Sequence, residues 1–322
     1  MADKQALNAT FFAFRKRDKA VLLPTTIAFA VLALGTFALF AALNWQASVD
    51  YLNWAASMGA ASTKPTQGPP SFEAMMPPAS VMSLIPAYLL FVLAYYVLLA
   101  AYEAACLRWM IRGETAGLFG FSLGADTWRV YFTYWIWLLL LIAFYIVCAI
   151  TVGGAAVSMI AMSQAGGEPS LSAVLIPLVL GVVILLGLIY FSVRLAPAAA
   201  TSVARKRFAF FDAWKVSKGR FWGLLGAFLL LFLMYMVLCI ALGVAWGVFM
   251  GVAVLGQGMQ SGDPQSAEEA LRAFANPQML TGVALMYVVL IVAAFTFYVA
   301  LFGVNARAAQ LALEEGKITA GA

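Results

Sequence analysis

The sequence contains no histidine, and only 10% of its 322 residues are charged. The missing histidine excludes Ser-His-Asp and Cys-His hydrolysis, His-ligated zinc or haem, and any acid–base step on an imidazole. Charged residues make up about a quarter of a typical soluble domain. A chain this poor in charge cannot cover its surface for water, so we expect an integral membrane protein.

Cysteine is also scarce. Cys106, Cys148 and Cys239 lie far apart and form no C-x-x-C pair, which argues against a disulfide framework or a thiolate metal site. The phosphate-binding loop, the dinucleotide fingerprint and the G-x-S-x-G elbow are absent. We therefore expect a protein that is not an enzyme and that holds no metal and no cofactor.

Apolar residues are abundant, at 64% of the chain. A spanning helix needs roughly 20 mostly apolar residues, and six runs qualify, at residues 20–45, 80–104, 130–158, 172–195, 221–254 and 279–304. The first run is longer than the apolar region of a cleaved signal peptide, so we interpret it as a span. The predicted fold class is all-α, a polytopic membrane helical bundle that forms one integral membrane domain over residues 1–322.

The distribution of basic residues predicts the orientation. If the termini and the loops after the second and fourth spans share one side, that side holds seventeen of the nineteen lysines and arginines and carries +9. The other side carries −4, with Lys64 and Arg272 as its bases. By the positive-inside rule both termini are cytoplasmic. The net charge of +5 thus reflects topology, and we expect no nucleic-acid partner.

A basic, aromatic-rich stretch precedes each odd-numbered span, at residues 8–19, 119–132 and 204–222. We expect these stretches to form amphipathic helices at the membrane interface, with rings in the lipid and amines at the headgroups. Their recurrence suggests three repeated helical hairpins, each an interfacial helix followed by two spans.

The third stretch carries the candidate lipid site. Helical spacing places Phe210, Phe211 and Trp214 on one face as interfacial aromatics. The candidate headgroup ligands are Arg205, Lys206, Arg207, Lys215, Lys218 and Arg220, because clustered bases attract anionic lipid. Two alternatives stay open: the stretch anchors and orients the spans only, or it docks a soluble partner.

Two ionisable residues fall near the inner ends of spans. Glu103 lies at the end of the second span and Arg194 at the end of the fourth. Charges at membrane depth are costly and are usually paired, so a Glu103–Arg194 pair could form a gate or a headgroup site. Alternatively, Glu103 pairs with Arg108 or water, and Arg194 extends to a lipid phosphate.

The fifth span contains Gly243, Gly247 and Gly251 in a G-x-x-x-G-x-x-x-G pattern. Small residues at this spacing let helices approach closely. The pattern fits a packing contact inside the bundle or the face of a homodimer.

The segment from residue 190 to 231 also carries a family resemblance. A span ends in R-L-A-P, and F-x-x-A-x-x-x-S-x-G-R-F-W leads into the next span; the matching positions are Arg194, Pro197, Phe210, Ala213, Trp214, Ser217, Gly219, Arg220 and Phe221. This resembles the YciC-like family and the membrane domain of membrane-anchored glycerophosphodiester phosphodiesterases. The resemblance implies a bacterial inner-membrane protein linked to envelope or lipid homeostasis. The hydrolase barrel of the enzymatic members depends on histidine, which this chain lacks, so their activity is not carried over.

The leading prediction is a non-enzymatic inner-membrane protein that binds anionic headgroups at its cytoplasmic face. One alternative is a transporter or channel for a small or amphiphilic solute, which a polar cavity lined by Tyr95, Tyr96, Tyr102, Glu103 and Arg194 would favour. Another alternative is an accessory subunit or assembly factor of a larger membrane complex. Anionic lipids are the expected partners, and a homo-oligomer is compatible with the sequence.

Overall fold

The computed structural model describes residues 9–15, 22–62, 76–164, 171–256 and 277–321. Throughout these residues the regular elements are helices, and no β-strand occurs among them. Within the described ranges, six helical segments are long and apolar enough to cross a membrane. The chain is therefore an all-α, multi-pass membrane protein, which confirms the predicted fold class.

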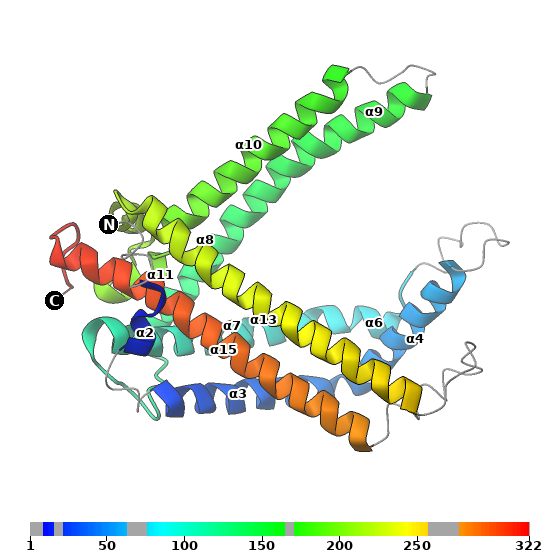
Figure 1. Ribbon diagram of the computed structural model, residues 1–322, viewed down its shortest axis with the longest axis horizontal. Coiled ribbons are helices and arrows are strands. Elements are labelled where there is room, and N and C mark those ends of the chain that lie inside the picture. The colour runs from blue at the N-terminus through cyan, green and yellow to red at the C-terminus, as the bar shows by residue number, and fades with distance from the viewer. Residues whose placement is uncertain (1–8, 16–21, 63–75, 165–170, 257–276, 322) are drawn as a thin grey trace.

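Consecutive spans pair as antiparallel hairpins (Figure 1). The first hairpin contains α3 (Leu22–Leu43), α4 (Trp45–Ser62), α6 (Ala79–Met82) and α7 (Leu84–Arg112). The second contains α8 (Ala125–Cys148), the π-helix η1 (Ala149–Gly153), α9 (Gly154–Gln164) and α10 (Leu171–Leu195). The third contains α13 (Phe221–Gly256) and α15 (Pro277–Glu314). Whether the three hairpins are internal repeats stays a prediction.

The third and fifth apolar runs, residues 130–158 and 221–254, are longer than the roughly 20 residues that a span needs, and the structure accommodates them differently. The third run changes to the wider π-helix η1 at Ala149–Gly153, a rare element that occurs mostly as a single turn inside an α-helix. The fifth run stays one α-helix of 36 residues, which is about 54 Å long against a hydrocarbon core of about 30 Å. α13 must therefore tilt or extend beyond the apolar layer.

Two helices continue past the predicted ends of their spans. α7 runs to Arg112, where Gly113 adopts φ +70° and its N–H bonds to the Trp109 carbonyl, as expected of a left-handed C-cap. α15 runs to Glu314. Its last turns bury small side chains, Ala306, Ala308, Ala309 and Ala312, which carry a weak hydropathy signal but allow close packing.

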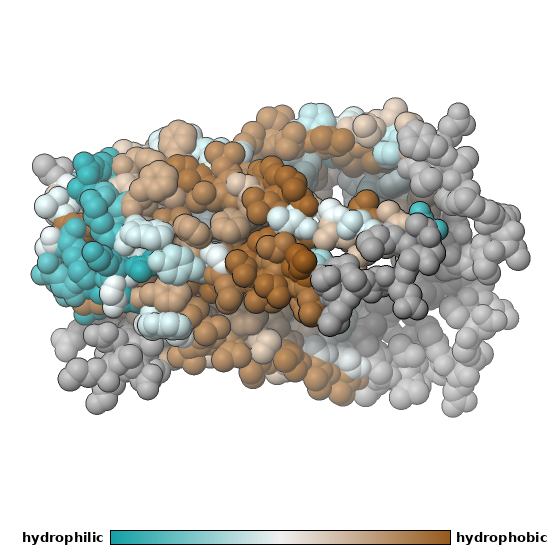
Figure 2. Space-filling view, turned by 90° about the horizontal axis from the view of Figure 1, so that it is seen from above, coloured by the Kyte–Doolittle hydropathy of each residue, from teal (hydrophilic) through white to brown (hydrophobic). Residues whose placement is uncertain are grey.

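The core lies at one end of the bundle, around the short helix α11 (Ala198–Ala204), all of whose residues are buried. Helices α7, α8 and α15 pack around it. α2 and the last turns of α15, the first and last described helices, lie at this end (Figure 1). We call it the charged end, because hydrophilic residues gather there while apolar residues cover the middle of the molecule (Figure 2).

Beyond the core, the spans expose large apolar side chains such as Leu34, Leu90 and Leu186. Such a surface suits lipid rather than water. Packing between helices within the chain is therefore concentrated at the charged end.

The predicted interfacial amphipathic helices are wrong in the described regions. α2 covers Phe12–Arg15. Of the second stretch, residues 119–124 are irregular and residues 125–132 form the beginning of α8, whereas the third stretch forms the 3-10 turn η2 (Phe210–Asp212) and α12 (Ala213–Ser217). α2, η2 and α12 are too short to present a continuous amphipathic face. They instead pack into the charged end, where Ala13, Phe210 and Val216 are almost completely buried.

Candidate functional site

A buried arginine–aspartate cluster joins α7 to α8. The Asp126 carboxylate accepts from Arg112 at 2.6 Å and from Arg129 at 2.5 Å, and it lies 3.9 Å from Arg108. Arg108 also donates to the Gly120 carbonyl at 3.1 Å. The Arg108 and Asp126 side chains are 4% and 10% exposed. Sequence reasoning missed this cluster; the signal was the i, i+4 arginine pair at the end of α7 and an acid in the first turn of α8.

Asp212 forms ion pairs with several bases of the third basic stretch, residues 204–222. Its carboxylate pairs with Arg205, with Lys215 at 3.2 Å and with Arg207 at 3.5 Å. Burial, the largest single influence, raises the pKa of Asp212, but the Lys215 hydrogen bond and the surrounding positive charges together outweigh it and leave the pKa below its ordinary value. Asp212 therefore stays ionised and neutralises part of the basic stretch.

A second ion-pair group ties the beginning of α13 to the end of α15. Arg220 pairs with Glu315, and Lys317 lies 2.9 Å from the same carboxylate. Hydrogen bonds from Lys317 and Arg220 lower the pKa of Glu315 below its ordinary value. Arg220 also reaches the Val216 and Ala308 carbonyls at 3.4 Å.

The six candidate headgroup ligands therefore divide into two groups. Arg205 and Arg220 have side chains only 13% and 14% exposed and are held by carboxylates, so they are structural. The exposed bases are Lys206, Arg207, Lys215 and Lys218. Among the described residues, Lys206 and Lys218 have no carboxylate partner, which leaves their charges available at the surface.

The predicted aromatic face is wrong for one of its three members. Phe210 is 1% exposed and packs against Ala213, Leu195 and Trp137. Phe211 and Trp214 are 71% and 38% exposed. Phe210 lies in the 3-10 turn η2 with its side chain buried, whereas the adjacent Phe211 is exposed, so only Phe211 and Trp214 of the three remain candidates for interfacial rings.

The predicted Glu103–Arg194 ion pair is also wrong. Glu103, 6% exposed, accepts a hydrogen bond from the Tyr134 hydroxyl. Arg194 lies among the rings of Tyr190, Trp214 and Phe221. The alternative Glu103–Arg108 pair is not formed, because Arg108 points to Asp126 and Gly120.

The residues expected to line a polar solute cavity do not share one. Tyr95 and Tyr102 line an apolar pocket of about 450 Å³ between α3, α7 and α15. Tyr96 instead lies against Tyr134, with ring centres 6.0 Å apart, and neither Glu103 nor Arg194 borders this pocket. The arrangement offers no continuous polar surface through these five residues.

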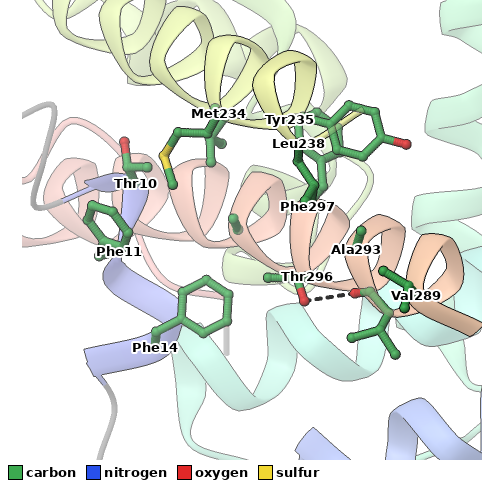
Figure 3. A pocket seen from close by; sticks show the side chains of 13 residues that line it. Thr10, Phe11, Phe14, Met234, Tyr235, Leu238, Val289, Ala293, Thr296 and Phe297 are labelled. Carbon is green, nitrogen blue, oxygen red and sulfur yellow. Dashed lines mark hydrogen bonds between the residues drawn. The ribbon is translucent and has the colours of Figure 1, made fainter. Parts of the chain in front are cut away.

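A further pocket of about 380 Å³ lies between α13 and α15 (Figure 3). Residues Thr10, Phe11 and Phe14 of the N-terminal segment border it at one end. Its Thr296 hydroxyl donates to the Val292 carbonyl at 2.8 Å within α15. No charged residue lines this pocket, so it can accept an apolar group.

The glycine pattern of α13 does not mark a close contact within the described chain. A Cβ atom added at Gly243 or Gly247 would meet nothing within 4 Å outside its own helix. The surroundings of Gly251 lie outside the described residues. The homodimer interpretation of this face stays a prediction.

Among the described residues, no group of three or more cysteine, aspartate and glutamate side chains could hold a metal ion. Comparison with family models, curated proteins and solved structures finds no match. The arrangement can therefore be interpreted only from its chemistry: exposed cations and rings around the end of an apolar bundle.

Proposed function

We propose that this chain is a non-enzymatic protein of a bacterial inner membrane whose cytoplasmic face binds anionic lipid headgroups. One observation carries the proposal: exposed Lys206, Arg207, Lys215 and Lys218 lie beside exposed Phe211 and Trp214, where the apolar spans end. Each base near a membrane surface contributes about 1 kcal/mol of attraction to anionic lipid. Neighbouring rings favour the same layer, because their apolar faces enter the lipid while the amines reach the phosphates.

The orientation is part of the proposal. The first and last described helices, α2 and α15, have their chain-terminal ends at the charged end, and the positive-inside rule assigns such an end to the cytoplasm. The resemblance of residues 190–231 to the YciC-like family supports a role in envelope or lipid homeostasis, since that segment forms much of the charged end. Within this role the protein acts by binding and positioning lipid, without covalent chemistry.

The test compares two double variants that each remove two positive charges. Lys206→Gln with Lys218→Gln removes exposed bases of the charged end. The matched control, Lys64→Gln with Arg272→Gln, removes the two bases that topology assigns to the opposite side; both lie outside the described residues. Phosphatidylglycerol and phosphatidylcholine with identical chains are titrated onto the full-length protein in mild detergent, and retained lipid is measured by native mass spectrometry.

We expect the wild type to prefer phosphatidylglycerol. The charged-end variant should lose about 2 kcal/mol of that preference, or about thirtyfold in relative affinity, and the control should retain it. Equal retention of both lipids by the wild type would contradict the proposal, as would equal losses in the two variants.

A further inference from the structure

Arg194 occupies an aromatic cage at the charged end. It lies in the last turn of α10. Its guanidinium carbon is 5.4 Å from the ring centre of Tyr190, 5.3 Å from that of Trp214 and 5.8 Å from that of Phe221. Each distance falls within the range of a cation–π contact. Three elements, α10, α12 and α13, thus converge on one cation.

The cage leaves two nitrogens of the Arg194 guanidinium without a hydrogen-bond partner. Its Nε and Nη1 atoms are buried and have no hydrogen-bond partner, whereas Nη2 is not among the buried unpartnered nitrogens. The side chain as a whole remains partly exposed. Arginine cannot lose its charge in a protein, and ring faces offset only part of the cost of removing a guanidinium from water.

The other largely buried arginines of the charged end each lie near a carboxylate. Arg108 and Arg112 lie near Asp126, Arg205 pairs with Asp212, and Arg220 pairs with Glu315. Arg194 has no carboxylate partner among the described residues. A counter-anion for Arg194 therefore has to come from outside these residues, and the partly exposed side chain leaves it accessible to one.

The surroundings of the cage favour an amphiphilic anion. α10 and α13 are close at the charged end, where the Tyr190 and Phe221 ring centres are 5.3 Å apart, and they diverge toward the opposite end (Figure 1). Along these diverging stretches both helices expose apolar side chains, such as Leu186 on α10 and Phe232 on α13. A free phosphate would leave these side chains uncovered, whereas the acyl chains of a lipid would cover them.

We propose that Arg194 binds the phosphodiester of an anionic glycerophospholipid whose acyl chains lie along α10 and α13. A guanidinium donates two parallel hydrogen bonds to phosphate oxygens, and the ring cage restricts the side chain to one orientation. This inference rests on the proposed headgroup function and adds a defined single site to it. Lys206 and Lys218 supply long-range attraction, and Arg194 supplies the direct contact.

The experiment uses full-length Arg194→Gln and Arg194→Lys variants. Arg307→Gln is the matched control, because Arg307 also lies over a ring, 5.7 Å from the centre of Phe12, but has a carboxylate partner in Glu314. The tightest phosphatidylglycerol site is titrated by native mass spectrometry. Thermal unfolding is measured in parallel with and without that lipid, since a ligand stabilises the fold according to its affinity.

We expect Arg194→Gln to weaken the tightest site at least tenfold and to abolish the stabilisation by phosphatidylglycerol. Arg194→Lys, which keeps the charge but loses the planar fork, should bind with intermediate affinity. Arg307→Gln should bind as the wild type does. A water-soluble glycerol phosphate at millimolar concentration should not displace the lipid.

Three results would overturn the cage assignment. One is wild-type affinity in both Arg194 variants. Another is that lipid-free Arg194→Lys unfolds at a lower temperature than the lipid-free wild type, while phosphatidylglycerol raises the unfolding temperature of both proteins equally. That result would indicate a structural role for Arg194. The last is displacement by glycerol phosphate, which would indicate a site for a free anion. If Lys206→Gln with Lys218→Gln weakens lipid retention while the Arg194 variants do not, the proposed function stands without the cage.

Discussion

Replacing Asp126 with asparagine tests the buried cluster that joins α7 to α8. The amide side chain would keep the size of the aspartate and one acceptor oxygen but would remove the charge that faces Arg108, Arg112 and Arg129. These three arginines are 4%, 13% and 22% exposed. The substitution leaves their positive charges close together with little access to water.

The expected magnitude follows from that burial. Removing one partner of a buried ion pair costs about 3–5 kcal/mol, mainly because the remaining charge is uncompensated. Arg112 also pairs with Glu114 at 2.9 Å, and Glu114 is 52% exposed. An exposed pair of this kind contributes about 0–1 kcal/mol. The Glu114→Gln variant is therefore a control on the same arginine.

The measurement is the free energy of unfolding in mixed detergent micelles, followed by tryptophan fluorescence. We expect Asp126→Asn to lose about 3–5 kcal/mol and Glu114→Gln less than about 1 kcal/mol. A double-mutant cycle with Arg112→Met should show strong coupling to Asp126. Similar small losses in both single variants would refute the reasoning, because they would show that water screens the cluster.

Three further predictions concern the same end. The pKa values of Asp212 and Glu315 lie below their ordinary 3.8 and 4.5. The two ionised carboxylates therefore stabilise the fold fully above these ordinary values, and this stabilisation is lost as pH falls below them. The free energy of unfolding measured from pH 7 to pH 3 should show the loss, and Asp212→Asn should reduce it. Tyr134→Phe leaves the buried Glu103 carboxyl without its donor and should cost about 1–3 kcal/mol, measured by denaturant unfolding; no change would show that water replaces the hydroxyl. Gly113→Ala forces a Cβ atom into the φ +70° conformation and should cost about 1 kcal/mol, whereas substitution at Gly243, which lies mid-helix in open space, should not destabilise the fold by strain.

The errors of sequence interpretation share a physical cause. The sequence favours a Glu103–Arg194 pair because both residues are charged and both lie near the inner ends of spans. Depth along a helix says nothing about the direction of a side chain, and the packing of α8 brings Tyr134 to Glu103 instead. Similarly, helical spacing placed Phe210 beside Phe211, but the backbone there forms a 3-10 turn and buries Phe210 in the core.

The buried ion pairs were hidden from sequence reasoning for a related reason. Asp126 and Arg112 are separated by a turn of residues 113–124, in which Gly113, Gly117 and Gly120 adopt positive φ. The route of this turn sets which charges meet, and Thr25 of α3 supports it by donating to the Phe119 carbonyl at 2.6 Å. Such a contact joins positions 94 residues apart, which no local pattern reports.

The sequence by itself determined the fold class and the six spans. These properties follow from composition and run length, because a bilayer requires long apolar helices whatever their neighbours are. Only the tertiary structure decided which bases are free. Asp126, Asp212 and Glu315 neutralise some arginines, whereas Lys206, Lys218 and Arg194 have no carboxylate partner among the described residues. Charge pairing depends on side-chain direction and distance, and these arise when the helices pack at the charged end.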